Sequence, residues 1–381
     1  MGVFVRYRYD RSNMALRGSD CLYFHDLRFS NLALSSSLSI RPGLSLSERR
    51  SLFISYQTKQ GDILYGECPP LPGVHEESFE QAAALLQADC QQALPEIRLD
   101  WSQNINWSQP YFGLINGPAM PSVKFAMEQI LWQAIFWYFP DSPYYQQIPQ
   151  SLQTELAGLV HFQKQARERA PAEVYKLKIG RQDFDSDLQS ISQFLQDKTC
   201  RLRLDANQSL RLQDILALAA ILSPEQVELI EEPFPATDPA WQTYAGPFAL
   251  AMDESLWNLR PGAPMLSPWV SKLVLKPARL GLSGSIAWLQ TLKDPAQDAV
   301  LSSCYESGWS LAILLQMSAY FHLQAALGFG TYDYLQEDVL VERLNLSPGK
   351  VHLPLQLPCL NKSCLKPYPG VWGGLSHESQ L

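Results

Sequence analysis

Cysteine is scarce in this chain, and its seven cysteines are scattered without a CxxC pair. This spacing offers no zinc motif and favours reduced thiols over a disulfide framework, as in proteins of the cytoplasm. Runs of lysine and arginine are also missing, and the net charge is −8 at pH 7, so we expect no nucleic-acid partner. The small basic clusters, such as Arg49-Arg50, are expected on a solvated surface.

Long apolar runs are absent as well. The most apolar stretch, residues 125–139, is interrupted by Glu128, Gln129 and Gln133, and is too short and too polar to cross a bilayer. The opening residues MGVFVRYRYDRSN become polar within a few positions and lack the apolar core of a signal peptide. We therefore expect a cytoplasmic protein without a membrane partner, and the pattern specifies no oligomeric state.

The first part of the chain has a pattern typical of antiparallel strands followed by helices. Residues 3–9 alternate between apolar and polar, and residues 52–58 and 63–67 predict a hairpin. Helices are expected at residues 78–94 and 120–139. A chain of 381 residues is long enough for two domains, and this block differs in type from the rest of the chain.

From about residue 150 short apolar runs alternate with amphipathic segments. Eight runs, from a weak one at residues 152–156 to the last at residues 328–335, predict parallel strands with helices between most of them. Six runs end in a polar residue at intervals of 22 to 27 residues, the length of one unit of a (β/α)₈ barrel of about 250 residues. Since such barrels hold their chemistry at the carboxyl ends of the strands, one mouth should bring together Lys178, Asp205, Glu231, Asp253, Lys276 and Ser303.

Three acids on consecutive predicted strands predict a metal site. The carboxylates of Asp205, Glu231 and Asp253 suit Mg²⁺, with Mn²⁺ as an alternative, and leave coordination positions for a substrate carboxylate and water. Lys178 and Lys276 flank these acids, and a lysine near a dication can act as a base because its ammonium form is disfavoured. Each acid alone could equally be a strand-end residue neutralised by a lysine, but their common register favours the metal site.

This set of residues fits proton abstraction next to a carboxylate, so we expect a small-molecule carboxylate as substrate. The resulting enediolate carries two negative oxygens, which a bound dication stabilises as a Lewis acid, while a positioned base contributes about 10²–10⁴-fold. Phosphoryl transfer fits less well because GLSGS at residues 281–285, the nearest approach to a phosphate loop, lacks the lysine of that motif.

Several motifs in this order resemble the enolase superfamily, in its muconate-lactonising branch. They extend from about residue 61 to residue 335 and are GECPPLPGVHEESFEQA, MPSVKFAMEQ, KLKIG, RLRLDANQSL, LIEEPF, AMDESL, VLKPARLG, LSSCYESGWSL and GFGTYD. The resemblance implies an α/β fold: a (β/α)₇β TIM-like barrel at residues 109–335, closed by an α+β capping domain at residues 1–108. Residues 336–381 are expected to complete the capping domain.

By motif position the resemblance also implies roles for single residues. Lys178 would be the acid/base, Lys276 would stabilise the anion, and Asp205, Glu231 and Asp253 would hold Mg²⁺. The loop at residues 70–73 would lie over the barrel mouth and contact the substrate. A further set is expected near the substrate or the metal: Lys176, Arg203, Asn207, Ser302, Ser303 and Gly328.

Three functions remain open within this resemblance. The segments PPLPG and SSCYES favour an enzyme that dehydrates its substrate. A racemase or epimerase would use the same residues, with both lysines exchanging the proton. A non-catalytic binding relative is the third possibility, and the complete set of two lysines and three acids argues against it. The sequence departs from the family pattern at residues 208–210 and at Cys304-Tyr305, which affects only local substrate contacts.

Overall fold

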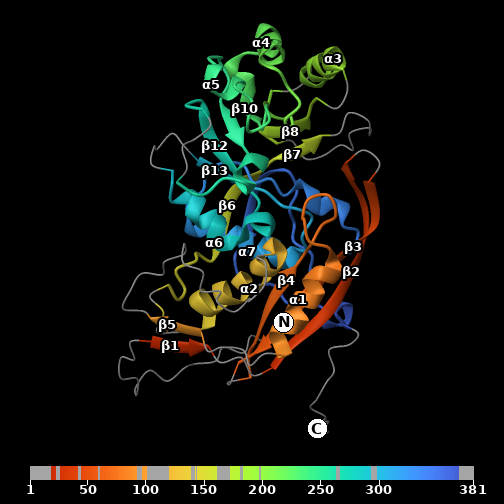
Figure 1. Cartoon of the computed structure of the whole chain (residues 1–381), viewed down its shortest axis with the longest axis vertical. Helices are drawn as coiled ribbons and strands as arrows, with labels where there is room; N and C mark the ends of the chain where they lie inside the picture. Colours follow the sequence, from red (N-terminus) through yellow and green to blue (C-terminus); the bar gives the residue numbers. More distant parts are fainter. Residues whose placement is uncertain are drawn as a thin grey trace.

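The computed structural model describes residues 19–22, 26–41, 44–58, 61–91, 97–100, 120–138, 142, 144–160, 172–180, 183–196, 199–262, 267–292 and 298–368. The strand predicted at residues 3–9 lies outside these residues. Figure 1 shows a long antiparallel sheet, coloured red to orange, beside a curled sheet of parallel strands, coloured yellow to blue.

The antiparallel sheet has four strands in the order β15 (Lys366–Pro367), β2 (Asp26–Arg41), β3 (Leu44–Gln57) and β4 (Ile63–Cys68). The pairing of β3 with β4 confirms the predicted hairpin. β15 pairs antiparallel with Asn31 and Ser30 of β2, so residues 366–367 lie at an edge of this sheet. Two shorter strands, β1 (Ser19–Leu22) and β5 (Ile97–Asp100), pair with each other.

Two helices accompany this sheet, α1 (Phe79–Gln91) and α2 (Pro121–Gln133), and α2 continues as a π-helical turn, η2 (Ala134–Tyr138). The glutamines that interrupt the apolar run of α2 have a structural role. Gln129 exchanges two hydrogen bonds with the backbone of Glu67, and Gln133 does the same with Tyr65. Since β4 is an edge strand, these amides satisfy backbone groups that would otherwise be buried without partners.

The parallel sheet has seven strands: β7 (Gly158–Val160), β8 (Val174–Lys178), β9 (Arg201–Asp205), β10 (Val227–Glu231), β11 (Leu250–Met252), β12 (Val270–Leu275) and β13 (Asp298–Leu301). Its two edges are joined by a short eighth segment, because Ser302 bridges to Gly328 and Leu156 bridges to Leu327. The result is the predicted (β/α)₇β barrel. Its helices are α3 (Phe184–Leu195), α4 (Leu212–Ile221), α5 (Ala240–Thr243), α6 (Pro277–Leu289) and α7 (Gly308–Tyr320).

The first barrel strand was expected at residues 152–156, and this is wrong. That segment, β6 (Ser151–Leu156), pairs antiparallel with β14 (Gly349–Pro354), while β7 is the strand that pairs with β8. Parallel barrel strands are buried on both faces, whereas β6 is half exposed along most of its length, which suits a two-stranded ribbon. The last predicted strand is likewise reduced to the bridges at residues 327–328, followed by the 3₁₀ turn η5 (Gly330–Tyr334).

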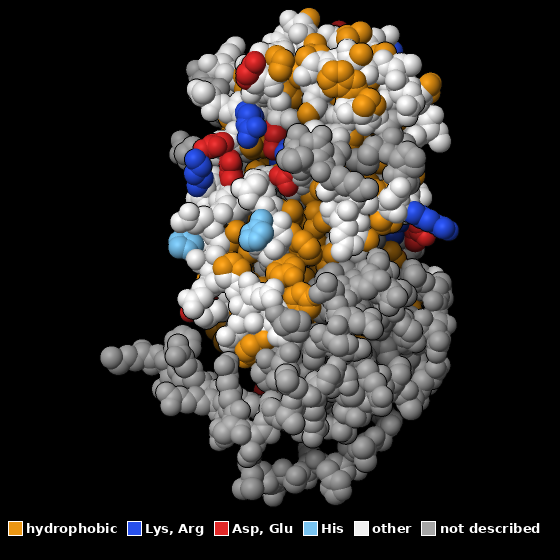
Figure 2. All heavy atoms as spheres, turned by 90° about the vertical axis from the view of Figure 1, so that its left-hand side faces the viewer, with side chains coloured by type: hydrophobic (Ala, Val, Ile, Leu, Met, Phe, Trp, Pro, Cys, Tyr) orange, Lys and Arg blue, Asp and Glu red, His pale blue; other side chains and the backbone are white. Residues whose placement is uncertain are grey.

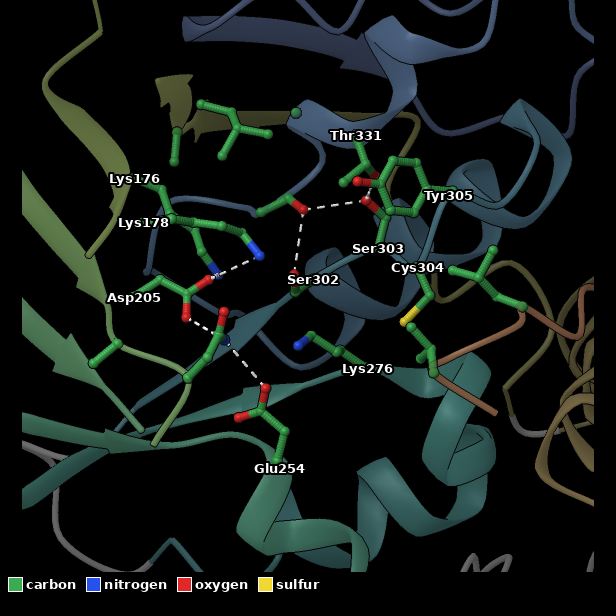
Figure 3. Close-up of a pocket in the computed structure, with 18 of the residues that line it drawn as sticks. Lys176, Lys178, Asp205, Glu254, Lys276, Ser302, Ser303, Cys304, Tyr305 and Thr331 are labelled. Carbon is green, nitrogen blue, oxygen red and sulfur yellow. Dashed lines mark hydrogen bonds and ion pairs between the residues drawn. The ribbon is translucent and has the colours of Figure 1, made fainter. Parts of the chain in front are cut away.

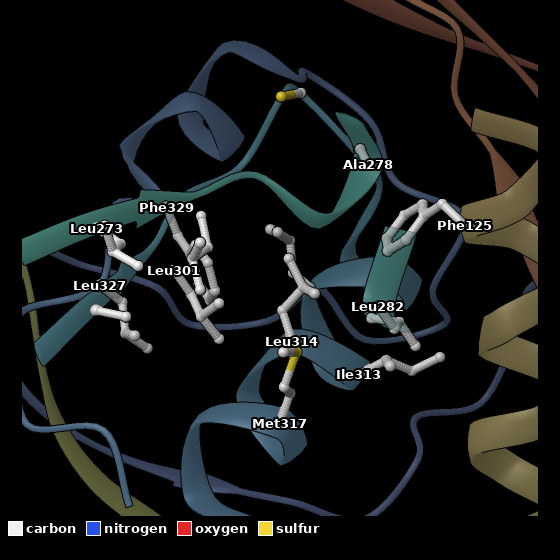
Figure 4. Packing of buried hydrophobic residues seen from close by; sticks show 14 of the residues in the cluster. Phe125, Leu273, Ala278, Leu282, Leu301, Ile313, Leu314, Met317, Leu327 and Phe329 are labelled. Atoms are coloured by element: carbon white, nitrogen blue, oxygen red, sulfur yellow. The ribbon is translucent and has the colours of Figure 1, made fainter. Parts of the chain in front are cut away.

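One buried apolar cluster joins the barrel to α2. In Figure 4, Phe125 of α2 faces Ala278 and Leu282 of α6, and Leu314 of α7 lies between them and the barrel strands. All four of these side chains are at most 1% exposed, so the packing is continuous across the boundary between the two parts. No helix in the described part of the chain is long and apolar enough to cross a membrane.

The segment GLSGS is a helix start that is already occupied. Gly281 has φ +77°, which breaks α6 into a first turn and a main helix. The carboxylate of Glu128 on α2 accepts hydrogen bonds from the backbone N–H of Ser283 at 3.1 Å and from its hydroxyl at 2.5 Å. A carboxylate therefore fills the place where a helix N-terminus would otherwise receive a phosphate.

Figure 2 shows one outer face of the molecule. On its described part, acidic and basic side chains lie next to one another, so no extended patch of one charge sign occurs on that face. The large hydrophobic side chains that are exposed in the described part of the chain include two from α4, Leu216 and Ile221, and three from elsewhere in the chain, Ile63, Trp269 and Val341.

Candidate active site

A cavity of about 610 Å³ opens at the carboxyl ends of the barrel strands. Figure 3 shows that Lys176 and Lys178 enter it from one side, Lys276 from another, and Ser302 and Ser303 from a third. Leu71, Gly73 and Val74, from the loop after β4, also line it. The cavity thus lies between the barrel mouth and the first sheet.

The three predicted acids lie side by side on neighbouring strands. Asp205 ends β9 and is in register with Glu231 at the end of β10, which is in register with Ala251 of β11, two residues before Asp253. Asp205 lines the cavity, while Glu231 and Asp253 are 0% exposed. Three buried carboxylates at the ends of neighbouring strands require compensating positive charge.

Lysines supply this charge. Lys176 Nζ lies 2.9 Å from Asp205 Oδ2 and 2.7 Å from Glu231 Oε1. Lys276 Nζ forms an ion pair with Asp253 Oδ2, and Lys178 Nζ lies farther from its acid, 3.6 Å from Asp205 Oδ2. Lys178, with 26% of its side chain exposed, is the most accessible of the three ammonium groups.

Burial and the neighbouring charges together shift the pKa values of the three acids and of Lys276, and not all in the same direction. Burial would raise the pKa of Asp205 and Glu231, but the neighbouring lysines, Lys176 foremost, lower both. Burial raises the pKa of Asp253 well above its ordinary value, although Lys276 opposes this. Burial alone would lower the pKa of Lys276, but the carboxylate of Asp253 raises it well above the ordinary value. Lys276 is therefore held as an ammonium ion in this arrangement.

The donor set fits a hard dication in its chemistry. Asp253 Oδ1 and Glu254 Oε2 are buried and have no hydrogen-bond partner among the described residues. An orphaned buried carboxylate oxygen is costly unless a cation or water meets it. Within that same part of the chain no three acidic, histidine or cysteine side chains converge on one point as they stand. The acids contact the ammonium groups of Lys176 and Lys276 instead.

Most of the remaining predicted residues also lie at the cavity. Asn207 donates to Asp205 Oδ1 at 2.6 Å and to Glu254 Oε1 at 3.2 Å. Ser303 Oγ donates to the carbonyl of Gly328 at 3.2 Å. A Cβ at Gly328 would lie 2.9 Å from Ser302 Oγ, so the close approach of the closing segment to β13 favours glycine here.

Arg203 is placed elsewhere. It is on the same face of β9 as Asp205 but one pleat deeper, where it is 0% exposed. Its guanidinium pairs with Glu228 at 2.8 Å and donates to the carbonyl of Ala326 at 3.2 Å. It belongs to the barrel interior and does not line the cavity.

Other cavity residues escaped the sequence analysis as site residues. Glu254, Trp257, Tyr305 and Thr331 line the cavity with Cys304. Glu254 directly follows a predicted ligand, and Cys304-Tyr305 stood out as a departure from the family pattern, so both carried a signal. Nothing in the sequence indicated that Trp257 and Thr331 belong to the site, because each reaches the cavity from a 3₁₀ turn that follows a strand.

Arg49 corrects an expectation. It was expected at the surface, but it is 2% exposed and ties the PPLPG loop to the barrel. Its guanidinium donates to the carbonyls of Pro69 at 2.7 Å, Pro70 at 2.9 Å and Tyr305 at 3.0 Å. A loop that lines the cavity is thus held by a buried charge against a loop that follows β13.

The fold and the cavity define a barrel protein with three acids between two lysines at its mouth. The family model described as "Enolase C-terminal domain-like" matches residues 159–357, which is more than half of the chain. The chain therefore belongs to the enolase superfamily, and its structural relatives include the muconate lactonizing enzyme from Pseudomonas putida, at 17% identity and a TM-score of 0.63 over 90% of this chain and 98% of that one.

Two curated relatives are o-succinylbenzoate synthases. The one from Citrobacter koseri is 27% identical over 319 residues, 79% of this chain and 86% of the relative. The one from Enterobacter sp. is 28% identical over 342 residues, 84% of this chain and 92% of the relative.

Other solved structures with this fold are epimerases. The L-Ala-D/L-Glu epimerase from Bacillus subtilis aligns with a TM-score of 0.66 at 16% identity, over 91% of this chain and 98% of that one. A dipeptide epimerase from Enterococcus faecalis, complexed with Mg and a dipeptide, aligns with a TM-score of 0.62 at 15% identity, over 89% and 98%. At these identities the likeness establishes the fold alone.

Proposed function

We propose that the chain is an o-succinylbenzoate synthase, a lyase of menaquinone or phylloquinone biosynthesis. It would dehydrate 2-succinyl-6-hydroxy-2,4-cyclohexadiene-1-carboxylate to 2-succinylbenzoate. One observation carries the proposal: Lys178 and Lys276, from strands separated by three others, reach the same cavity beside three buried acids. The names of the two curated relatives support the choice of reaction.

Lys178 is the residue proposed to move the proton. Its amine would take the proton from the carbon that carries the substrate carboxylate. The same group, now an ammonium ion, would give that proton to the departing hydroxyl. One C–H bond and one C–O bond break, one C=C bond forms, and one water leaves. The ring becomes aromatic, which drives the second step.

Lys276 is proposed as a fixed positive charge. Its ion pair with Asp253 keeps its pKa raised, which suits stabilisation of the anion formed after proton removal. Trp257 lies under this ammonium, with the nitrogen 5.7 Å from the ring centroid, and so helps to hold it in place.

Asp205, Glu231 and Asp253 are proposed to hold Mg²⁺, with Mn²⁺ as an alternative. When bound, the dication would supply neutralisation of the charge on the substrate carboxylate. The orphaned oxygen of Asp253 and the dense set of carboxylates support this assignment, as does the Mg in the E. faecalis epimerase structure. Lys176, paired with Asp205 and Glu231, would then redistribute its contacts. We also propose that the protein is located in the cytoplasm.

The second candidate is an N-succinylamino-acid racemase or a dipeptide epimerase. The epimerase structures that share this fold favour it. Both lysines would then exchange the proton, one on each face of the carbon. The names of the two curated relatives favour dehydration over this candidate.

A substrate comparison separates the two. The purified protein with Mg²⁺ is assayed with the cyclohexadiene carboxylate and, in parallel, with N-succinyl amino acids and dipeptides. The proposal predicts a kcat/KM for the cyclohexadiene substrate at least about a hundredfold above the others. Faster deuterium exchange and racemisation of an N-succinyl amino acid would instead assign the chain to the racemases.

A further inference from the structure

Three consecutive residues after the PPLPG loop bind two helices: Glu77 binds the start of α2, and His75 and Glu76 bind the first turn of α6. Glu77 accepts hydrogen bonds from the backbone N–H of Ser122 at 2.8 Å and from its hydroxyl at 2.6 Å, at the start of α2. Glu76 pairs with Arg279 at 3.1 Å, but its side chain is 86% exposed. His75 is buried and reaches the first turn of the barrel helix α6.

Both ring nitrogens of His75 have a backbone partner. Nδ1 lies 3.1 Å from the N–H of Leu71, and Nε2 lies 2.9 Å from the carbonyl oxygen of Ala278. An amide N–H can only donate, so Nδ1 must accept, and Nε2 must then carry the proton that it donates to the carbonyl. The geometry therefore fixes a neutral ring in one tautomer. Burial lowers the pKa of His75 to about 4, in agreement with a neutral ring.

The two partners of His75 belong to two different segments, the loop after β4 and the first turn of α6. Leu71 lines the cavity from the loop. Ala278 lies in the turn that closes on Lys276, since the N–H groups of Arg279 and Leu280 donate to the carbonyl of Lys276 at 2.8 and 3.0 Å. One ring thus connects the loop to the peptide segment that carries the proposed anion-stabilising lysine.

We propose that His75 is a positioning residue that fixes the PPLPG loop relative to Lys276 and thereby determines how tightly the substrate is held. The proposal relies on the proposed function only in taking the cavity as the substrate site. The Glu76–Arg279 pair cannot replace this bridge, because an exposed ion pair contributes little. Arg49 ties the loop on the side of Tyr305 but not on the side of Lys276. A loop that is already fixed loses less conformational entropy when the substrate binds. Removing the His75 bridge should therefore raise KM more than it lowers kcat.

Two variants each remove one half of the bridge. In His75→Asn the amide oxygen takes the place of Nδ1, which keeps the bond to Leu71 and loses Ala278. In His75→Gln the amide nitrogen takes the place of Nε2, which keeps Ala278 and loses Leu71. Either variant should raise KM about tenfold, which corresponds to about 1.4 kcal/mol, and change kcat less than threefold. Glu76→Gln, the matched control, should leave KM within twofold.

The kinetic test uses Mg²⁺-saturated enzyme, whichever of the two substrate classes the wild type turns over, and active-site titration to correct for inactive protein. A KM within twofold of wild type in both variants would overturn the proposal. So would a fall in the active fraction with an unchanged KM, because that is the result of a purely structural role.

A spectroscopic test is independent of turnover. In ¹⁵N-labelled wild type, the His75 ring, assigned by its absence in His75→Gln, should show protonated Nε2 and unprotonated Nδ1 from about pH 6 to about pH 8. A doubly protonated ring or the other tautomer would overturn the bridge even if the enzyme is active. If the wild type turns over neither substrate class but shows this spectrum, the proposed function fails and the bridge stands.

Discussion

Replacing Arg49 by lysine should measure what the buried guanidinium contributes. Besides the carbonyl of the adjacent Arg50, it binds three carbonyls that lie on two different loops, Pro69 and Pro70 on one and Tyr305 on the other. A planar fork reaches both loops at once, whereas an ammonium group on a flexible stem cannot. Arg49→Lys keeps the positive charge near Glu67 and Glu306, so the change isolates the geometry of the fork.

The expected loss of stability can be worked out from the hydrogen bonds of Arg49. At least two of the three hydrogen bonds from a charged donor disappear, and each contributes about 1.5–3 kcal/mol, so stability should fall by about 3 kcal/mol. Unfolding entropy of about 2.1 cal/mol/K per residue, over 381 residues, is about 0.8 kcal/mol/K. The melting temperature should therefore fall by about 4 °C.

The assay is differential scanning calorimetry of wild type, Arg49→Lys and a control, Arg50→Lys. Arg50 is adjacent in sequence but exposed, and its contact with Glu80 at 3.4 Å is a surface pair, so the control should shift by less than about 1 °C. Equal shifts for the two variants would refute the reasoning, as would an Arg49→Lys melting temperature within 1 °C of wild type.

Burial raises the pKa of Glu306 to about 7, so the folded protein keeps a proton that the unfolded chain loses, and stability should fall as pH rises from about 4.5 to about 7. Burial raises the pKa of Glu232 to about 7 as well, so Glu306→Gln should reduce this slope without abolishing it, and the variant should be more stable than wild type by about 1–3 kcal/mol above pH 7; an unchanged slope in urea unfolding would count against it. Replacing residues 70–73 by Gly-Ser should raise KM strongly without changing Mg²⁺ affinity by calorimetry, and an unchanged KM would exclude the loop from binding. Asp205→Asn, Glu231→Gln and Asp253→Asn should each abolish turnover and weaken Mg²⁺ binding while circular dichroism stays native; near-normal turnover in any one would show that its residue is not a ligand.

The barrel and the acids could be predicted because they rest on local patterns. Parallel strands buried on both faces read as apolar runs, and polar residues at their ends must meet at one edge of the sheet. This reasoning brought Lys178, Asp205 and Lys276 to one cavity. The same patterns could not rank β6 against β7, since both are short and β6 is chosen by its partner β14, almost two hundred residues later.

Depth and distant contacts could not be predicted. Arg203 and Asp205 share a face of β9, but the period of a strand does not say which residue lies at the mouth. In the sequence, Arg49 and Arg50 looked like a small basic cluster on the surface. Only the contacts of Arg49 with the loop after β13 explain why it is buried. His75 gave no signal, because its partner Ala278 is 203 positions away.

The central claim is that Lys178 removes the proton that starts a Mg²⁺-dependent dehydration. The most direct test follows the ultraviolet absorbance of 2-succinyl-6-hydroxy-2,4-cyclohexadiene-1-carboxylate as it becomes aromatic, with wild type and Lys178→Ala, each with Mg²⁺ and with a chelator. The account predicts turnover by wild type only with Mg²⁺, and a loss of about 10²–10⁴-fold in Lys178→Ala. Near-normal turnover by Lys178→Ala, or none by Mg²⁺-loaded wild type, would contradict it.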